Sequence, residues 1–331
     1  MLTQIIVHLF PHEIDQFEWQ SKQLKQGSYY LDDNDKVLMD VTLNLNLINW
    51  NESTIPKEYF TEKFNNLKKL YDWADTDFTV DEKGLCLGCN DKRRDSINKS
   101  TSDNIVYLDA DVIFNSYTLK YLIEASKEIK DEYYIISPQV PRMWDNTWDP
   151  LVNKKFMDME PSQETYKSFD VYNLIQQSDF SLKTFTPHPY ADLQAPLAHF
   201  KMGGGWFNIM STNLLKHITI PPSLGSYGLD DTFILICAGY MKLQNHSINQ
   251  YIIENLIVSE DHKYYNNPYN KYLKEIKYKG EFGSIKENFY NNAIKSFDIE
   301  YFKFIQRINP HHKNIDLNPP RMFIPKNNKN N

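Results

Sequence analysis

Short apolar runs alternate with amphipathic helical patterns along the first 140 residues, and this alternation constrains the fold more than any other feature of the sequence. The apolar runs have the length of strands, whereas the segments between them repeat with the period of a helix. We expect strands at Ile5–Phe10, Lys36–Ile48, Ile105–Leu108 and Tyr134–Ser137, and helices at Glu13–Leu24, Tyr59–Trp73 and Tyr117–Ile129. Strand–helix alternation of this kind favours an α/β domain with a mainly parallel sheet.

The pattern changes in the second half of the chain. A long polar and aromatic stretch runs from Pro141 to Phe200, and long insertions in compact domains are usually functional loops or lids. Strand or helix patterns resume at Phe207–Ile209, Asp231–Gly239, Ile252–Val258, Ile285–Phe297 and Ile299–Ile308. We therefore expect one α/β domain over residues 1–262, and a helical C-terminal extension over 263–331 whose last residues fray.

Charge and cysteine content narrow the classes of function. Lys and Arg total 36 against 43 Asp and Glu, a formal net charge of −7, whereas a dedicated nucleic-acid binder normally carries a basic surface. Three cysteines, an odd number, do not make a disulfide framework, which favours a reducing compartment. The N-terminus lacks the pattern of a signal peptide, and the most apolar stretch, Thr232–Met241, is too short to span a bilayer. We expect a cytoplasmic protein without a transmembrane segment, with peripheral membrane contact left open.

Two aspartates directly follow the apolar run Ile105–Leu108. That strand would deliver Asp109 and Asp111 to the carboxyl edge of the sheet, where open α/β sheets bind ligands. Two carboxylates at this edge suit Mg²⁺ or Mn²⁺, which prefer carboxylate and phosphate oxygens. The alternative is a pair of turn or helix-capping aspartates, because an Asp-x-Asp triplet also occurs by chance.

Glycine is scarce, with only 11 in the chain, and three of them are consecutive at Gly203, Gly204 and Gly205. Glycine serves where the backbone approaches another group closely or adopts a positive φ. The cluster therefore predicts a close approach to a ligand, and a tight bend beside a β-bulge is the alternative.

An acidic pair, Asp230 and Asp231, precedes an apolar helical pattern. These residues are either helix-capping and first-turn charges or a general base with its neighbour, since adjacent carboxylates often titrate apart. Later in the chain, His262 follows the strand-like Ile252–Val258 and is a candidate nitrogen ligand for the same metal. A lone histidine is, however, more often an ordinary surface or core residue.

Two arginines, Arg93 and Arg94, precede the strand that carries Asp109. Arginine suits bidentate contacts with phosphates or with the oxygens of a base ring, and a solvated helix face is the alternative. Cys86 and Cys89 form a lone CxxC pair. A zinc site would need two further ligands, so we interpret the pair as structural or incidental.

In their order, these motifs resemble those of the GT-A-fold glycosyltransferases, particularly the family 2-like enzymes that use nucleotide sugars. The match covers about residues 85–262. It implies a GT-A-type, Rossmann-like and mainly parallel sheet flanked by helices. It also implies a nucleotide-binding half over about 1–140 and an acceptor-binding half over about 141–262.

The resemblance implies a role for each candidate residue. Asp109, Asp111 and His262 look like metal ligands for Mn²⁺ or Mg²⁺, Asp231 like the catalytic base with Asp230 beside it, and Arg93, Arg94, Asp109, Gly204, Gly205 and Trp206 like the lining of the donor site. Trp206 is either a core residue or a stacking face for the sugar ring.

The activity implied is an inverting, metal-dependent transfer of a sugar from a UDP- or GDP-sugar to a glycan, lipid-linked or protein acceptor. A sugar nucleotidyltransferase is one alternative, but such enzymes usually have a glycine-rich loop after the first strand, and Phe10–Glu13 contains no glycine. A non-catalytic carbohydrate-binding protein on a transferase fold is the other. The ordered presence of Asp109, Asp111 and Asp231 argues against it.

Overall fold

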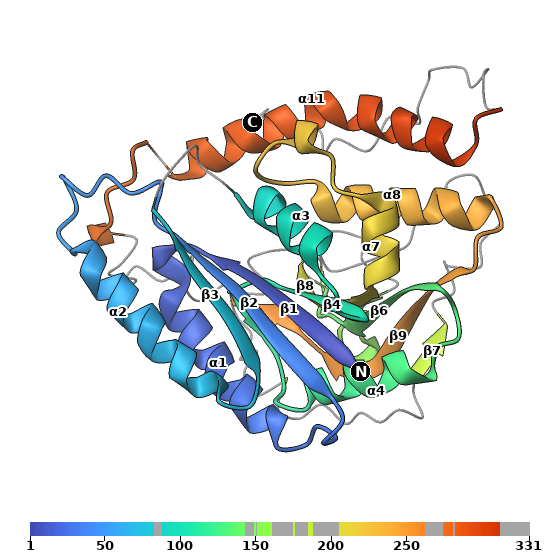
Figure 1. Cartoon of the computed structure of the whole chain (residues 1–331), viewed down its shortest axis with the longest axis horizontal. Coiled ribbons are helices and arrows are strands. Elements are labelled where there is room, and N and C mark those ends of the chain that lie inside the picture. Colours follow the sequence, from blue (N-terminus) through green and yellow to red (C-terminus); the bar gives the residue numbers. More distant parts are fainter. Residues whose placement is uncertain are drawn as a thin grey trace.

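The computed structural model describes residues 1–82, 88–142, 149, 151–160, 175, 185–187, 205–261, 274–280 and 282–311. In this part of the chain eight strands form one sheet in the order β3-β2-β1-β4-β8-β6-β9-β7 (Figure 1). Their bounds are β1 Leu2–Leu9, β2 Lys36–Asn44, β3 Asp75–Asp81, β4 Asn104–Leu108, β6 Tyr133–Gln139, β7 Phe185–Pro187, β8 Trp206–Ser211 and β9 Ile248–Ile257.

The sheet is mainly parallel. Strand β1 pairs in parallel with β2 and β4, β2 with β3, and β6 with β9. Strand β8 runs antiparallel to both of its neighbours, β4 and β6, and β7 runs antiparallel to β9. A separate two-stranded ladder joins β5 (Val112–Ile113) to β10 (Ser259–Glu260).

Both faces of the sheet are apolar, because the central strands are buried on both sides. Along β4, Val106 and Leu108 join the core on one face, whereas Ile105 and Tyr107 join the core on the other. Successive side chains of a strand point to opposite faces. A continuous apolar run is therefore the pattern expected of a strand covered by helices on both sides.

Helices cover the two faces as two layers (Figure 1). Helices α1, α2 and α4 lie on one face, and α3, α7, α8 and α11 lie on the other, where α11 runs along α8. Their bounds are α1 Ile14–Ser28, α2 Lys57–Lys68, α3 Cys89–Lys99, α4 Thr118–Glu128, α7 Thr212–Ile218, α8 Asp230–Leu243 and α11 Phe282–Ile308, with 3-10 turns η1 Pro11–Glu13, η2 Lys69–Tyr71, η4 Lys154–Phe156 and η7 Pro222–Leu224. No described helix combines the length and apolarity needed to cross a membrane.

The predicted architecture, a Rossmann-like and mainly parallel sheet flanked by helices with a helix at the C-terminal end, is confirmed. The two helical patterns expected at 285–297 and 299–308 are one helix, α11, because no helix-breaking residue separates them. Buried Ala293, Phe297, Phe304 and Ile305 of this helix pack in the same core as Phe233 of α8.

Candidate active site

Four parallel strands end at the same edge of the sheet, and this edge collects the candidate residues. The register pairs Leu9 of β1 with Leu43 of β2, and Asn44 of β2 with Asp81 of β3, while Asp109 follows the last residue of β4. Helices α3 and α8 contribute residues at the same edge, through Arg93 near the start of α3 and Asp230 at the start of α8. The carboxyl edge of an open α/β sheet is where ligands are expected to bind.

Arg93 joins the two acidic motifs that are far apart in the sequence. Its Nη1 donates to Asp230 Oδ2 at 3.0 Å, and its Nη2 donates to Asp109 Oδ1. The guanidinium also lies 4.5 Å above the ring of Tyr107, a favourable cation–π geometry. Because the arginine is only 6% exposed, these charge-assisted contacts fix β4, α3 and α8 relative to one another.

At Gly205, one of the few glycines in the chain, close packing against Asp109 requires the absence of a side chain. Its carbonyl accepts hydrogen bonds from the backbone N–H of Asp109 at 2.9 Å and of Phe207 at 3.0 Å. A Cβ at this position would collide with both carboxylate oxygens of Asp109. Phe207 then adopts a positive φ of 59°, and the start of β8 is thereby pressed against the Asp-x-Asp segment. Trp206 and Phe207 themselves are buried in the core.

Asp111 lies in a concentration of negative charge. Burial raises the pKa of Asp111 well above its usual range, and the carboxylates of Glu260, Glu13 and Asp109 raise it further. Burial likewise raises the pKa of Asp109, although Arg93 opposes the change. The β5–β10 ladder brings Glu260 there, because Glu260 pairs with Val112 and the backbone N–H of Asp261 donates to the carbonyl of Asp111 at 2.6 Å.

The donor set fits a hard divalent cation. Carboxylate oxygens are the groups that Mg²⁺ and Mn²⁺ prefer, and a bound dication would offset the repulsion that raises the pKa of Asp111. Among the described residues, no three ligating side chains form a complete metal site by themselves. His262, the third ligand expected from the sequence, lies outside the described residues, as does Gly204.

The acidic pair stands at the first turn of α8. Gly228 and Leu229 enter the helix with positive φ values of 88° and 63°, which turn the chain sharply before Asp230. Asp230 is buried and bonded to Arg93, whereas the half-buried Asp231 accepts a hydrogen bond from the backbone N–H of Thr232 at 2.6 Å. Burial and the adjacent Asp230 raise the pKa of Asp231 to about 6, close to the range in which a carboxylate serves as a general base.

The two arginines differ in what they contact. Arg93 reaches Asp109 and Asp230, but Arg94 donates to Asp91 on its own helix at 2.6 Å. The same Asp91 accepts a hydrogen bond from Ser226 at 2.6 Å. Arg94 therefore supports the loop that leads into α8, and the structure does not bring it to the Asp109 carboxylate.

Sequence reasoning missed three charged residues of this edge. Glu13 follows β1 in the turn η1, Glu260 lies within the segment already noted for His262, and Lys286 lies on α11. The positive charge of Lys286 opposes the rise in the pKa of Asp111. Glu260 could have been found from the sequence, because it lies two residues before the candidate ligand His262. Lys286 could not, because only tertiary packing brings α11 to this edge.

A thiol–imidazole pair also lies near this edge. Cys89 Sγ is 3.3 Å from His8 Nδ1, and His8 Nε2 is 3.5 Å from Asn44 Nδ2, which has the outline of a nucleophilic triad. Burial, however, raises the pKa of the Cys89 thiol to about 12. Only the thiolate is an effective nucleophile, so the pair does not indicate thiol catalysis.

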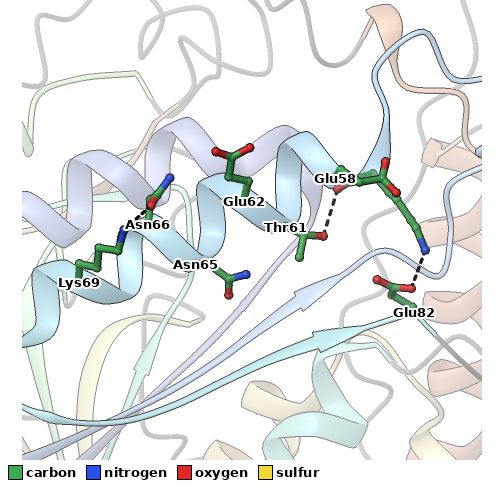
Figure 2. Close-up of a pocket in the computed structure, with 8 residues that line it drawn as sticks. Glu58, Thr61, Glu62, Asn65, Asn66, Lys69 and Glu82 are labelled. Carbon is green, nitrogen blue, oxygen red and sulfur yellow. Dashed lines mark hydrogen bonds and ion pairs between the residues drawn. The ribbon is translucent and has the colours of Figure 1, made fainter.

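A polar hollow lies elsewhere, on the solvent-exposed side of α2 (Figure 2). It holds an ion pair between Lys57 and Glu82 at 3.0 Å and a hydrogen bond from Lys69 to Asn66 at 2.8 Å. Its lining consists of Lys57, Glu58, Thr61, Glu62, Asn65, Asn66, Lys69 and Glu82. None of the residues Asp109, Asp111, Asp230, Asp231 and Arg93 lines it, so the hollow is distinct from the candidate site.

No protein-family model matches the sequence, and none of the curated proteins matches it significantly. Solved structures similar to the chain include TarS residues 1–349 from S. aureus, with 16% identity over 93% of this chain and 73% of that one, at a TM-score of 0.38. Another is glucosyl-3-phosphoglycerate synthase from Mycobacterium tuberculosis in complex with phosphoglyceric acid. It has 11% identity over 89% of this chain and 80% of that one, at a TM-score of 0.42.

A third similar structure is GalNAc-T7 with UDP, GalNAc and Mn²⁺, with 10% identity over 97% of this chain and 52% of that one, at a TM-score of 0.45. With TM-scores below 0.5, these three likenesses assign no role to any residue. The site described above rests on the chain's own contacts.

Proposed function

We propose that the chain is a metal-dependent glycosyltransferase, which moves a sugar from a UDP- or GDP-sugar to the hydroxyl of a glycan, lipid-linked or protein acceptor. The observation that carries this proposal is the link made by Arg93 between the Asp-x-Asp segment and the acidic start of α8. The Asp-x-Asp carboxylates, which could hold a cation for the diphosphate, and the candidate base Asp231 are thereby held in one site. The transfer of a sugar from a nucleoside diphosphate requires both.

In this reaction the acceptor oxygen attacks the anomeric carbon from the face opposite the diphosphate. The new bond joins the acceptor oxygen to that carbon, the bond from the carbon to the phosphate oxygen breaks, and its electron pair leaves with the nucleoside diphosphate. Asp231 takes the acceptor proton, and the sugar is transferred with inversion. A pKa near 6 leaves Asp231 ionised at neutral pH, and ready to accept that proton.

Asp109 and Asp111, with His262 as the third expected ligand, would hold Mn²⁺ or Mg²⁺. When bound, the cation supplies Lewis-acid stabilisation of the leaving diphosphate. The chain's own residues supply the rest: Arg93 orients Asp109 and Asp230 through direct hydrogen bonds, and Gly205 allows the backbone to approach Asp109 closely.

Calorimetric binding of UDP and GDP to the full chain, with and without Mn²⁺, tests this proposal. We expect at least one nucleotide to bind in a metal-dependent way, and Asp111→Asn to weaken that binding at least tenfold. Asp33→Asn, at an exposed position, is the matched control and should bind as the unmodified chain does. Failure of both nucleotides to bind would overturn the donor class, and unchanged binding in Asp111→Asn would overturn the metal assignment.

A further inference from the structure

Helix α11 carries a stripe of three residues at the spacing i, i+4 and i+8, namely Phe282, Lys286 and Tyr290. Residues at this spacing share one face of a helix. The ring of Phe282 packs at 5.2 Å from that of Phe10, just after β1. At the other end of the stripe, the ring of Tyr290 is so close to Gly228 that a Cβ there would be 2.9 Å from it.

The stripe therefore spans the candidate site, from the end of β1 to the start of α8, and Lys286 lies between its two aromatic ends. In Figure 1, α11 runs along α8, on the side of the sheet that also carries α3. The C-terminal helix is thus part of the wall of the site as well as part of the core.

Lys286 brings a positive charge into an aromatic setting. Its ammonium lies 4.8 Å from the ring centre of Phe282, 5.2 Å from that of Tyr227 and 5.8 Å from that of Phe10. These distances are within the range of cation–π attraction. Although burial opposes the charged form, neighbouring Tyr227, Glu13 and Asp111 together raise the pKa of Lys286 above its usual value, so the side chain keeps its proton at neutral pH.

Of the acids whose charges act on Lys286, Asp111 is also a candidate ligand of the divalent cation. Without a cation, the charge of Lys286 is offset in part by Asp111 and Glu13. A dication held by Asp109 and Asp111 would reduce the offset from Asp111, and an anionic ligand beside that cation would then be a better partner for the ammonium. Arg93 does not compete for this role, because its guanidinium is bonded to Asp109 and Asp230.

We propose that Lys286 of α11 binds the diphosphate of the nucleotide donor. This inference rests on the proposed glycosyltransferase function. The lysine ammonium offers three rotatable donors and acts as a point charge, which suits a phosphate oxygen. As the bond from the anomeric carbon to the phosphate oxygen breaks, the electron pair remains on the diphosphate. Lys286 keeps its proton and donates a hydrogen bond to the increased charge.

A purely structural role for Lys286, holding α11 against Tyr227 and Phe10, makes a different prediction. Such a role would affect folding and all ligands equally, whereas a diphosphate contact distinguishes nucleoside diphosphates from monophosphates. Lys286→Met keeps an apolar stem and removes the charge. Lys286→Gln also removes the charge but keeps a polar group at the end of the side chain, and Lys286→Arg keeps the charge. Lys295→Met, at an exposed position on the same helix, is the control for loss of one positive charge.

The test compares UDP with UMP, and GDP with GMP, by calorimetry on the full chain with Mn²⁺, with thermal unfolding as a check on folding. We expect Lys286→Met and Lys286→Gln to weaken diphosphate binding about 10–100-fold, in keeping with the loss of a charge-assisted contact, and to change monophosphate binding less than threefold. Lys286→Arg should recover most of the affinity, and Lys295→Met should change nothing.

Unchanged diphosphate binding in both Lys286→Met and Lys286→Gln would overturn the inference, as would an equal loss for the diphosphate and the monophosphate. Either result would leave the proposed function standing, because the unmodified chain would still bind the nucleotide with metal. If the unmodified chain bound no nucleoside diphosphate, the proposed function would fall together with this inference.

Discussion

At the scale of single residues, the site is organised by one buried cation between two acids. Arg93 is bonded to Asp109 and Asp230 and lies over Tyr107. A buried arginine with carboxylate partners on two other elements restricts the positions of all three groups. Asp231 follows Asp230 directly, so the position of the candidate base depends on the same contact.

The raised pKa of Asp231 predicts how activity depends on pH. Burial and the neighbouring Asp230 move this pKa from 3.8 to about 6, so below pH 6 the carboxyl is protonated and cannot accept a proton. We expect kcat/KM to fall about tenfold for each pH unit below 6 and to level off above it. A pH profile of the unmodified chain beside Asp231→Asn checks this.

In Asp231→Asn the fall of kcat/KM below pH 6, the acidic limb of the profile, should vanish, and turnover should fall about 10²–10⁴-fold. Asp298→Asn, at an exposed position on α11, should keep the limb and the rate. A limb near pH 6 that persisted in Asp231→Asn would assign it to another group and remove Asp231 as the base.

Gly205 is the second residue whose substitution has a specific consequence. Because a Cβ there would collide with the carboxylate of Asp109, Gly205→Ala should displace that carboxylate and lower turnover about 10–100-fold. Gly283→Ala is the matched control, since a Cβ at Gly283 would meet nothing within 4 Å. Steady-state rates of both variants make the comparison, and full activity in Gly205→Ala would show that the close approach to Asp109 is dispensable.

At the scale of elements, the junction between α3 and α8 positions the acids Asp230 and Asp231 at the start of α8. The buried Asn90 near the start of α3 donates from its side chain to the carbonyl of Gly228 at 2.9 Å, and from its backbone to that of Ser226 at 3.2 Å. Gly88, just before α3, has no room for a Cβ beside the Ser226 carbonyl. The two segments are therefore held in close contact where α8 begins.

Removing the Asn90 amide should loosen this junction. We expect Asn90→Ala to cost about 1 kcal/mol, because it removes the hydrogen bond from the buried Asn90 amide to the half-buried Gly228 carbonyl, and to lower turnover by more than the loss of folded protein explains. Urea unfolding and rate measurements on the same samples separate the two effects. Asn66→Ala, on the exposed side of α2 in the hollow of Figure 2, is the control and should change neither stability nor turnover. An Asn90→Ala variant that is destabilised but has the full rate would show that the junction does not position the acids.

Pattern reasoning recovered the elements that carry a strong apolar pattern. The apolar runs of β1 and β4 predicted strands because both faces of these strands are covered. Strand β3 was missed because it is an edge strand with only two apolar residues, Phe78 and Val80, among polar residues such as the exposed Asp75 and Asp77. A sequence of this kind resembles a polar loop until a neighbouring strand is known.

At the scale of the whole molecule, two cores lie on the two faces of the sheet, and α11 completes the second. The sequence predicted a helical C-terminal extension and the two acidic motifs, Asp109 with Asp111 and Asp230 with Asp231, because each of these has a local signal. It did not predict that Lys286 lies against the rings of Tyr227 and Phe10, since that placement arises from the packing of α11. Residues supplied to a site by a distant helix have no local pattern that reveals them.

The release of nucleoside diphosphate from a panel of UDP- and GDP-sugars by the full chain, with Mn²⁺ and with or without acceptors, tests the central claim most directly. We predict release from at least one donor, loss of that release when EDTA removes the metal, and a rate that is lower by about 100-fold or more in Asp231→Asn. A chain that neither binds nor consumes any of these donors, or an Asp231→Asn variant with the full rate, would contradict the account.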